Sequence, residues 1–230
     1  MWQAIVFDLD DTLYPERDYV LSGFRAVAGW AELNLGIPSA RGLRELTGLF
    51  DEGVRGDTFN LWLAREGLAP AAIVPDLLRV YREHEPKLST FAEVESVISG
   101  LGGRYRLGLV SDGYLGVQQR KWKALGLEGY FDAVVFSDEL GREHWKPSPR
   151  PFETVLERLG AEAHRAVYVA DNPAKDFYGA RLLGMFTVRV RRPGGEYYSL
   201  DPEAPMHAPH VTLSCLTALE ERLSEGSMTR

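Results

Sequence analysis

The stretch that decides the fold is WQAIVFDLDDTLYPE, residues 2–16. An apolar run typical of a buried strand leads directly into three acidic residues, Asp8, Asp10 and Asp11, within four positions. Carboxylates this close repel one another, and removing them from water is costly unless a cation or hydrogen bonds compensate. The stretch therefore predicts a buried strand whose end requires a compensating partner.

Five further stretches are mostly apolar, like this first one over residues 3–9. They are residues 105–111, 132–137, 165–170, 185–190 and 210–214. Amphipathic patterns lie between them, and Gly126, Gly160 and Gly184 stand where such helices would end. Apolar strands that alternate with helices are typical of a parallel sheet covered on both faces. We therefore predict an α/β fold with a Rossmann-like open parallel sheet.

The interval between the first two strands is too long for a simple connection. It has no clear strand and its patterns are helical, whereas a single crossover needs only one helix. We predict an inserted α-helical cap domain over residues 15–86, hinged near Pro15 and Pro86, and an α/β core made of residues 1–14 and 87–230. Residues 191–209, with four prolines and two adjacent glycines, predict a long irregular loop.

The composition argues against several classes of partner. The 230 residues carry a net charge of −7 with no basic patch, so nucleic acid is not expected as a partner. No apolar run reaches the roughly 18 residues that span a membrane, and the N-terminus lacks a signal-peptide pattern. The single cysteine, Cys215, fits a reducing compartment. We expect a cytoplasmic protein, either a monomer or a homodimer.

Four polar segments are expected to meet at one edge of the predicted sheet. The carboxyl ends of parallel strands share an edge, and ligands of open α/β sheets bind there. The segments are DLDDT (8–12), SDG (111–113), HWKPSP (144–149) and DNPAKD (171–176).

Two simpler explanations of the acidic residues fit less well. An EF-hand calcium loop would not place Thr12 and Leu13 at its fifth and sixth positions, nor follow a strand. Solvated acids at strand ends would explain one cluster but not two on one edge.

As a set, the motifs identify a family. DLDDT (8–12), VSDGY (110–114), KPSPRPF (146–152) and VADNPAKD (169–176), in this order and approximate spacing, resemble the haloacid dehalogenase-like hydrolase superfamily. The similarity is to its phosphatase branch with a helical cap inserted after the first strand, and it covers nearly the whole chain. The resemblance also implies that the backbone carbonyl of Asp10 is a metal ligand.

The chemistry expected of the acidic residues is nucleophilic attack on a phosphate monoester. Asp8 is ionised at neutral pH and needs no general base, but it repels a phosphate dianion. Mg²⁺ would remove that repulsion by binding both, with Asp8 and Asp171 as its carboxylate ligands. Asp10 is expected to protonate the leaving group and then to activate water, which requires a raised pKa that a nearby carboxylate would favour.

The other segments are expected to bind the phosphoryl group. Ser111, with the backbone N–H groups of Asp112 and Gly113, would hold phosphoryl oxygens, and Lys146 would bind these oxygens and Asp8. Asp176 is expected to hold a metal-bound water, to fix Lys146, or only to complement a helix N-terminus.

Three residues beside these segments are left open. Asn172 would hydrogen-bond the site or merely cap its turn. His144 and Trp145 would either contact substrate or pack within their loop.

We therefore expect a Mg²⁺-dependent phosphatase that forms an aspartyl-phosphate on Asp8 and acts on a small phosphorylated metabolite, because a closing cap would exclude larger substrates. A dehalogenase is a weaker alternative, since a departing halide needs no proton and Asp10 would be superfluous. Phosphonate hydrolysis by the resembling enzymes uses a cap lysine, and residues 15–85 contain none. A phosphomutase, or a binding protein with a relict site, remains open.

Overall fold

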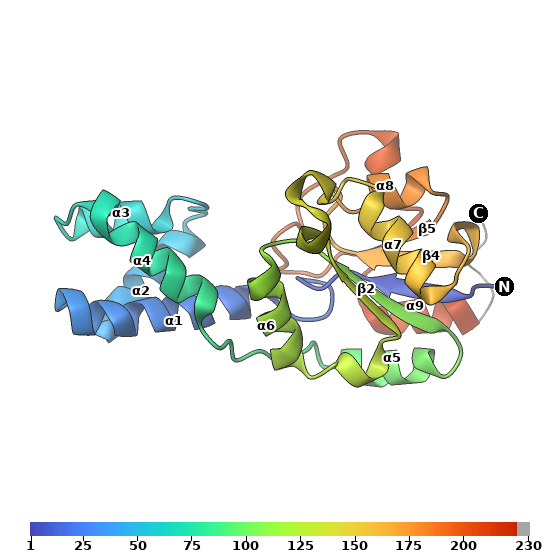
Figure 1. Cartoon of the computed structure of the whole chain (residues 1–230), viewed down its shortest axis with the longest axis horizontal. Coiled ribbons are helices and arrows are strands. Elements are labelled where there is room, and N and C mark those ends of the chain that lie inside the picture. The colour runs from blue at the N-terminus through green and yellow to red at the C-terminus, as the bar shows by residue number, and fades with distance from the viewer. Residues whose placement is uncertain (225–230) are drawn as a thin grey trace. The chain divides into compact units, whose positions relative to one another are not determined.

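A six-stranded parallel sheet forms the core of the larger compact unit in the computed structural model, which describes residues 1–224 (Figure 1). Its strand order is β3-β2-β1-β4-β5-β6, and every neighbouring pair is parallel. The strands are β1 (Ala4–Phe7), β2 (Arg106–Ser111), β3 (Ala133–Phe136), β4 (Ala166–Ala170), β5 (Phe186–Val190) and β6 (Val211–Leu213). All six lie within the predicted stretches, so the predicted α/β fold with an open parallel sheet is confirmed.

The central position of β1 determines where the functional side chains meet. This strand pairs with β2 on one side and β4 on the other, and its four residues are fully buried. Asp8 therefore emerges in the middle of the carboxyl edge of the sheet. Ser111 ends β2 on one side, and Asp171 follows β4 on the other.

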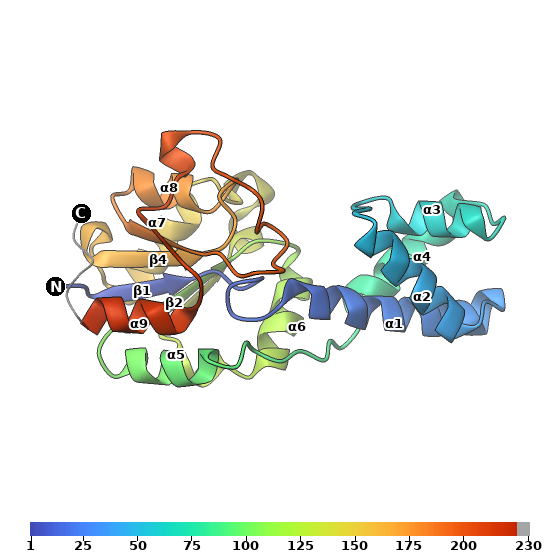
Figure 2. The same ribbon diagram turned by 180° about the vertical axis from the view of Figure 1, so that it is seen from behind.

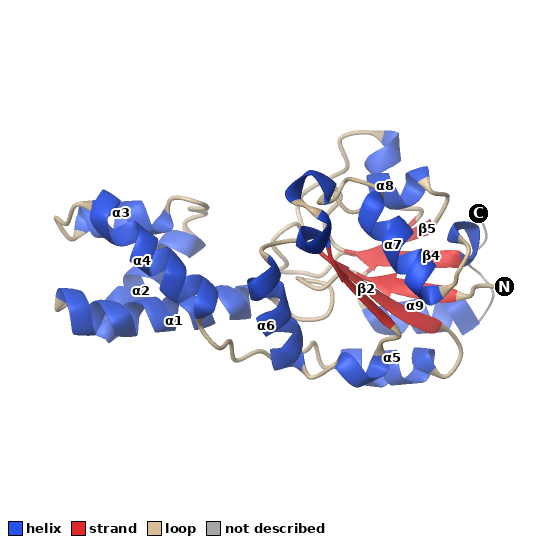
Figure 3. Ribbon diagram, in the orientation of Figure 1, coloured by secondary structure: helices blue, strands red, loops and turns tan. Residues whose placement is uncertain are grey.

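Helices cover both faces of the sheet (Figures 1 and 3). They are α5 (Val94–Gly102), α6 (Leu115–Leu125), α7 (Arg150–Leu159), α8 (Phe177–Leu182) and α9 (Leu216–Ser224). Helices α7 and α8 lie on one face, while α5 and α9 lie on the other, as the view from behind also shows (Figure 2). Gly126 and Gly160 end α6 and α7 in the left-handed conformation, as predicted.

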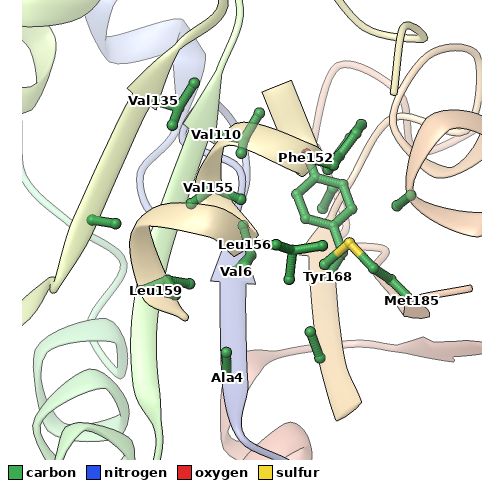
Figure 4. Packing of buried hydrophobic residues seen from close by; sticks show 14 of the residues in the cluster. Ala4, Val6, Val110, Val135, Phe152, Val155, Leu156, Leu159, Tyr168 and Met185 are labelled. Carbon is green, nitrogen blue, oxygen red and sulfur yellow. The ribbon is translucent and has the colours of Figure 1, made fainter. Parts of the chain in front are cut away.

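The core beneath α7 connects packing to the functional edge. Figure 4 shows Phe152 and Leu156 of α7 packed beside Tyr168 of β4. The Phe152 and Tyr168 rings meet edge to face with centroids 4.8 Å apart. Burial of such aromatic side chains is a large favourable contribution to folding. Because Tyr168 is amphipathic, this apolar contact also fixes a hydroxyl group near the end of the sheet.

A glycine allows α8 to lie close to the loop that carries Lys146. A Cβ atom at Gly179 would lie 2.6 Å from the Pro147 carbonyl oxygen and 2.8 Å from that of Ser148. Any larger residue would therefore push this helix away from the loop.

The chain divides into two compact units, Met1–Glu16 with Leu88–Arg230, and Arg17–Lys87. The second unit holds α1 (Glu16–Leu35), α2 (Ser39–Asp51), α3 (Thr58–Arg65) and α4 (Pro70–Glu83), with α1 starting one residue before it. Its own core contains the fully buried Trp62, Leu46 and Leu77. These boundaries lie within two residues of the predicted ones, and a cap role for the second unit stays a prediction.

Among the described residues, none of the helices is both long and apolar enough to cross a membrane. Residues 191–209 contain only turns and one short 3₁₀ helix, η5 (Pro205–His207).

Candidate active site

Asp8 lies directly after β1 and is almost completely buried. Its backbone N–H donates a hydrogen bond to the Val169 carbonyl oxygen at 2.9 Å, which continues the pairing of β1 with β4 by one residue. Burial raises the pKa of Asp8 to about 7, although the Lys146 ammonium acts in the opposite direction. A bound cation would favour the ionised form of this carboxylate.

Two further carboxylates surround Asp8. Oxygen atoms of Asp8, Asp171 and Asp176 all lie within 4.8 Å of one another, and all three residues are buried. Burial, followed by the charges of Asp176 and Asp8, raises the pKa of Asp171 well above its usual value. A cluster of oxygen ligands with excess negative charge is the donor set that Mg²⁺ prefers, so these residues fit a divalent cation.

Lys146 is fully buried and connects most of this cluster. Its Nζ lies 2.5 Å from Asp8 Oδ1 and 2.7 Å from Asp176 Oδ1, and it donates a hydrogen bond to the Tyr168 hydroxyl at 3.1 Å. Burial alone would lower the pKa of Lys146, but Asp176 and Asp8 raise it well above its usual value. The other Asp176 oxygen accepts the Asn172 backbone N–H at 2.9 Å. Both carboxylate oxygens of Asp176 are thus engaged in fixing its neighbours.

The end of β2 holds the loop of Lys146 in place. The Asp112 carboxylate accepts the Lys146 backbone N–H at 3.1 Å and the Ser137 hydroxyl. Ser111 is fully buried and donates to the Gln118 side-chain oxygen at 3.2 Å. Gly113 follows at a φ of 129°, where a side chain would be strained. Besides its predicted backbone N–H, Asp112 therefore contributes a side chain that sequence reasoning did not use.

The predicted raised pKa of Asp10 is wrong. Its carboxylate accepts hydrogen bonds from Lys121 Nζ at 2.7 Å, from the Tyr14 hydroxyl and from Gln118 Nε2 at 3.4 Å. Burial raises the pKa of Asp10, but Lys121, together with Tyr14, outweighs burial and lowers it. A neighbouring carboxylate is expected to raise the pKa of Asp10, but the ammonium group of Lys121 on α6 has the larger effect and lowers it.

A cavity of about 400 Å³ opens beside these side chains. The predicted residues that line it are Asp8, Asp10, Asp112, Gly113, Trp145, Lys146 and Asp171. Four residues that sequence reasoning missed also line it, namely Glu16, Gln118, Lys175 and Tyr197. Its size suits a small ligand.

Several predicted residues lie next to the cavity without lining it. Ser111 and Asp176 are fully buried behind it, and Asn172 caps its own turn by accepting the Ala174 backbone N–H at 2.9 Å. His144 is partly exposed and does not line the cavity. Trp145 does line it, and its indole N–H donates a hydrogen bond to Asp138 at 3.2 Å.

Known proteins are similar to this chain in both sequence and fold. A family model described as haloacid dehalogenase-like hydrolase matches residues 5–190. The glyceraldehyde 3-phosphate phosphatase of Methanopyrus kandleri is 35% identical over 88% of this chain and 88% of its own. That of Methanothermobacter thermautotrophicus is 32% identical over 83% and 86%. A crystal structure titled as a HAD phosphatase from Thermococcus onnurineus has a TM-score of 0.63 at 28% identity, covering 96% and 97%.

The structure thus defines a Rossmann-like α/β protein with an acidic site at the carboxyl edge of its sheet. The chain belongs to the haloacid dehalogenase-like hydrolase family, in its phosphatase branch, as predicted.

Proposed function

We propose that the protein is a Mg²⁺-dependent phosphatase that hydrolyses small phosphate monoesters through an aspartyl-phosphate on Asp8. The observation that carries this proposal is the buried constellation around Asp8. Its carboxylate lies within 4.8 Å of those of Asp171 and Asp176 and 2.5 Å from the Lys146 ammonium, at the edge of a cavity of about 400 Å³.

The proposed metal ligands are the carboxylates of Asp8 and Asp171 and the backbone carbonyl of Asp10. When bound, Mg²⁺ would neutralise charge shared by the nucleophile and the phosphoryl oxygens. Asp176 is proposed to hold Lys146, because one of its oxygens contacts that ammonium and the other accepts the Asn172 N–H.

The nucleophile is oriented by Lys146, and a bound cation would keep it in the ionised form that attacks. An oxygen of Asp8 attacks phosphorus, and the bond between phosphorus and the leaving oxygen breaks. Lys146 and the backbone N–H groups of Asp112 and Gly113 are the proposed donors to the phosphoryl oxygens. The Ser111 hydroxyl would join them only by leaving its hydrogen bond to Gln118. Asn172 is a further candidate for a hydrogen bond to the phosphoryl group.

Asp10 is the proposed proton carrier of both half-reactions. Its lowered pKa makes the ionised form dominant at neutral pH, so only the protonated minority gives a proton to the leaving oxygen. The ionised form takes a proton from the water that then attacks the phosphorus of the aspartyl-phosphate. Lys121 and Tyr14 hold its carboxylate in position. Since the Lys121 ammonium forms an ion pair with the Asp10 carboxylate, this contact is proposed to set the orientation of the carboxylate.

The substrate to test first is glyceraldehyde 3-phosphate. Two relatives that cover most of the chain carry its phosphatase activity in their names. The cavity volume fits a monoester of this size. A small phosphorylated metabolite is therefore the proposed partner.

The experiment is the release of inorganic phosphate from glyceraldehyde 3-phosphate by the purified protein with Mg²⁺, beside Asp8→Asn as a matched control. We expect turnover by the wild type and loss by orders of magnitude in the variant. Equal rates for the two proteins would contradict the role of Asp8. An absence of phosphate release from any monoester would contradict the proposed function as a whole.

A further inference from the structure

Part of the irregular 191–209 segment reaches the active-site cavity. Tyr197 lines this cavity, and its backbone carbonyl accepts a hydrogen bond from Arg189 Nη2 at 2.7 Å. The same guanidinium donates through Nε to the Asp171 carbonyl oxygen at 2.9 Å, and Arg189 is buried. One rigid group thus fixes both the end of β4 and the position of Tyr197.

Asp11, the third acidic residue of the DLDDT motif, connects the start of α1 to the 191–209 segment. Asp11 is buried, and its φ of 51° lies in the left-handed region, which non-glycine residues rarely adopt. One carboxylate oxygen accepts the Glu16 backbone N–H at 2.9 Å, and the other accepts that of Glu196, also at 2.9 Å. Asp11 therefore holds Glu16 and the residue before Tyr197 in a fixed relation.

Apart from Asp171, the proposed metal ligand, Glu16 differs from the other acidic residues that line the cavity. Asp8 and Asp10 form ion pairs with lysines, and Asp112 accepts two hydrogen bonds from the Lys146 backbone. Over residues 1–224, by contrast, no hydrogen bond or ion pair engages the half-buried Glu16 carboxylate. It is a polar group in the cavity that lacks a partner until a ligand arrives.

Tyr197 lines the same cavity as Glu16, and its phenol feels the charge of that carboxylate. Burial, followed by the Glu16 charge, raises the pKa of Tyr197 to about 12, so its hydroxyl keeps its proton. A carboxylate that accepts and a hydroxyl that donates and accepts are together suited to a ligand hydroxyl group. Lys175, in contrast, lies 3.8 Å from Asp112 and feels the charge of Asp8, so it belongs with the phosphoryl end of the cavity.

We propose that Glu16 and Tyr197, positioned by Asp11, form the subsite for the leaving group. It selects uncharged, hydroxyl-bearing leaving groups, such as a hydroxyaldehyde or polyol, over leaving groups that carry a carboxylate. A hydroxyl group of the leaving group would form hydrogen bonds with Glu16 and Tyr197, whereas a carboxylate on the leaving group would be repelled by Glu16. This inference rests on the proposed phosphatase function and narrows its substrate class.

The test compares glyceraldehyde 3-phosphate with 3-phosphoglycerate, which has the same carbon skeleton with a carboxylate in place of the aldehyde. The assay is run at pH 8 with Mg²⁺, because burial, with Asp10, raises the pKa of Glu16 to about 7 and the group is mostly ionised above it. We expect kcat/KM of the wild type to favour the aldehyde at least roughly tenfold, which is what one like-charge contact near a surface supplies. Glu16→Gln should lower the ratio of the two kcat/KM values about tenfold.

Two further variants separate the subsite from general damage. Tyr197→Phe should lower kcat/KM for glyceraldehyde 3-phosphate about three- to tenfold, the value of one neutral hydrogen bond. Tyr198→Phe is its matched control, because that exposed ring packs on Arg191 and does not line the cavity, and it should leave both values unchanged. Asp11→Ala should lower the substrate ratio although it contacts no substrate, since Glu16 and Tyr197 would lose their common anchor.

The outcomes distinguish this inference from the proposed function. If the wild type hydrolyses both substrates equally well, or if Glu16→Gln keeps the ratio, the inference is wrong while the phosphatase function stands. Equal effects of Tyr197→Phe and Tyr198→Phe would also overturn it. If the wild type releases phosphate from neither substrate nor from p-nitrophenyl phosphate, the proposed function itself fails. Thermal unfolding of each variant shows that the comparison is made on folded protein.

Discussion

Replacement of Lys146 by methionine is the perturbation whose effect can be worked out most fully from the structure. The change keeps an unbranched side chain of similar length but removes the ammonium that lies 2.5 Å from Asp8 and 2.7 Å from Asp176. Both carboxylates are buried and would face each other and Asp171 within 4.8 Å without a counter-charge. Breaking a buried ion pair from one side costs about 3–5 kcal/mol, a large part of the roughly 5–15 kcal/mol that stabilises an ordinary domain.

The same reasoning predicts an opposite effect on metal affinity. Without Lys146, a bound Mg²⁺ would provide the main positive charge among the three carboxylates, so we expect it to bind more tightly. Because a ligand of the folded state stabilises that state by mass action, Mg²⁺ should raise the unfolding midpoint of Lys146→Met more than that of the wild type. Phosphatase activity should still be lost, since the variant lacks the charge that also stabilises phosphoryl oxygens.

The assay is urea unfolding followed by circular dichroism, with EDTA and with Mg²⁺, beside phosphate release. Lys175→Met is the matched control for stability, because it removes the same charge from a partly exposed side chain 3.8 Å from Asp112. That pair is worth about 1 kcal/mol or less. The reasoning is refuted if Lys146→Met in EDTA is as stable as the wild type, or if Mg²⁺ stabilises the two proteins equally.

Two other predictions concern the proton carrier and the metal. Asp10→Asn should slow turnover of alkyl phosphates by about 10²–10⁴-fold, the usual contribution of general acid–base catalysis. The loss should be smaller for aryl phosphates, whose leaving groups need less protonation, and equal losses measured in steady-state assays would count against the role of Asp10. EDTA should abolish phosphate release and Mg²⁺ should restore it, whereas Ca²⁺ should substitute poorly because its coordination is larger and looser. Full activity in chelator would rule out the metal assignment.

The fold and the location of the site could be predicted because they depend on simple patterns. Strands buried on both faces are mostly apolar, and glycine at helix ends indicates left-handed caps, as Gly126 and Gly160 show. Parallel strands end at one edge, so the convergence of Asp8, Ser111 and Asp171 follows from topology alone.

The surroundings of Asp10 could not be predicted in the same way. Its partners Gln118 and Lys121 lie one turn apart on α6, and only the packed orientation of that helix directs both at the strand end. The sequence shows only that Lys121 follows Gln118 by three residues, which places both on one face of the predicted helix. Tyr197 had no such signal, because residues 191–209 have no periodicity and the fixing contact comes from Arg189.

The most direct test of the account is to trap the covalent intermediate. The purified protein is mixed with glyceraldehyde 3-phosphate and Mg²⁺, quenched in acid within the first turnovers, digested, and examined by mass spectrometry beside Asp8→Asn. The account predicts the added mass of one phosphoryl group on the peptide that contains Asp8 in the wild type, and no such addition in the variant. Steady phosphate release with the phosphoryl group found on another residue, or with Asp8→Asn turning over normally, would contradict it.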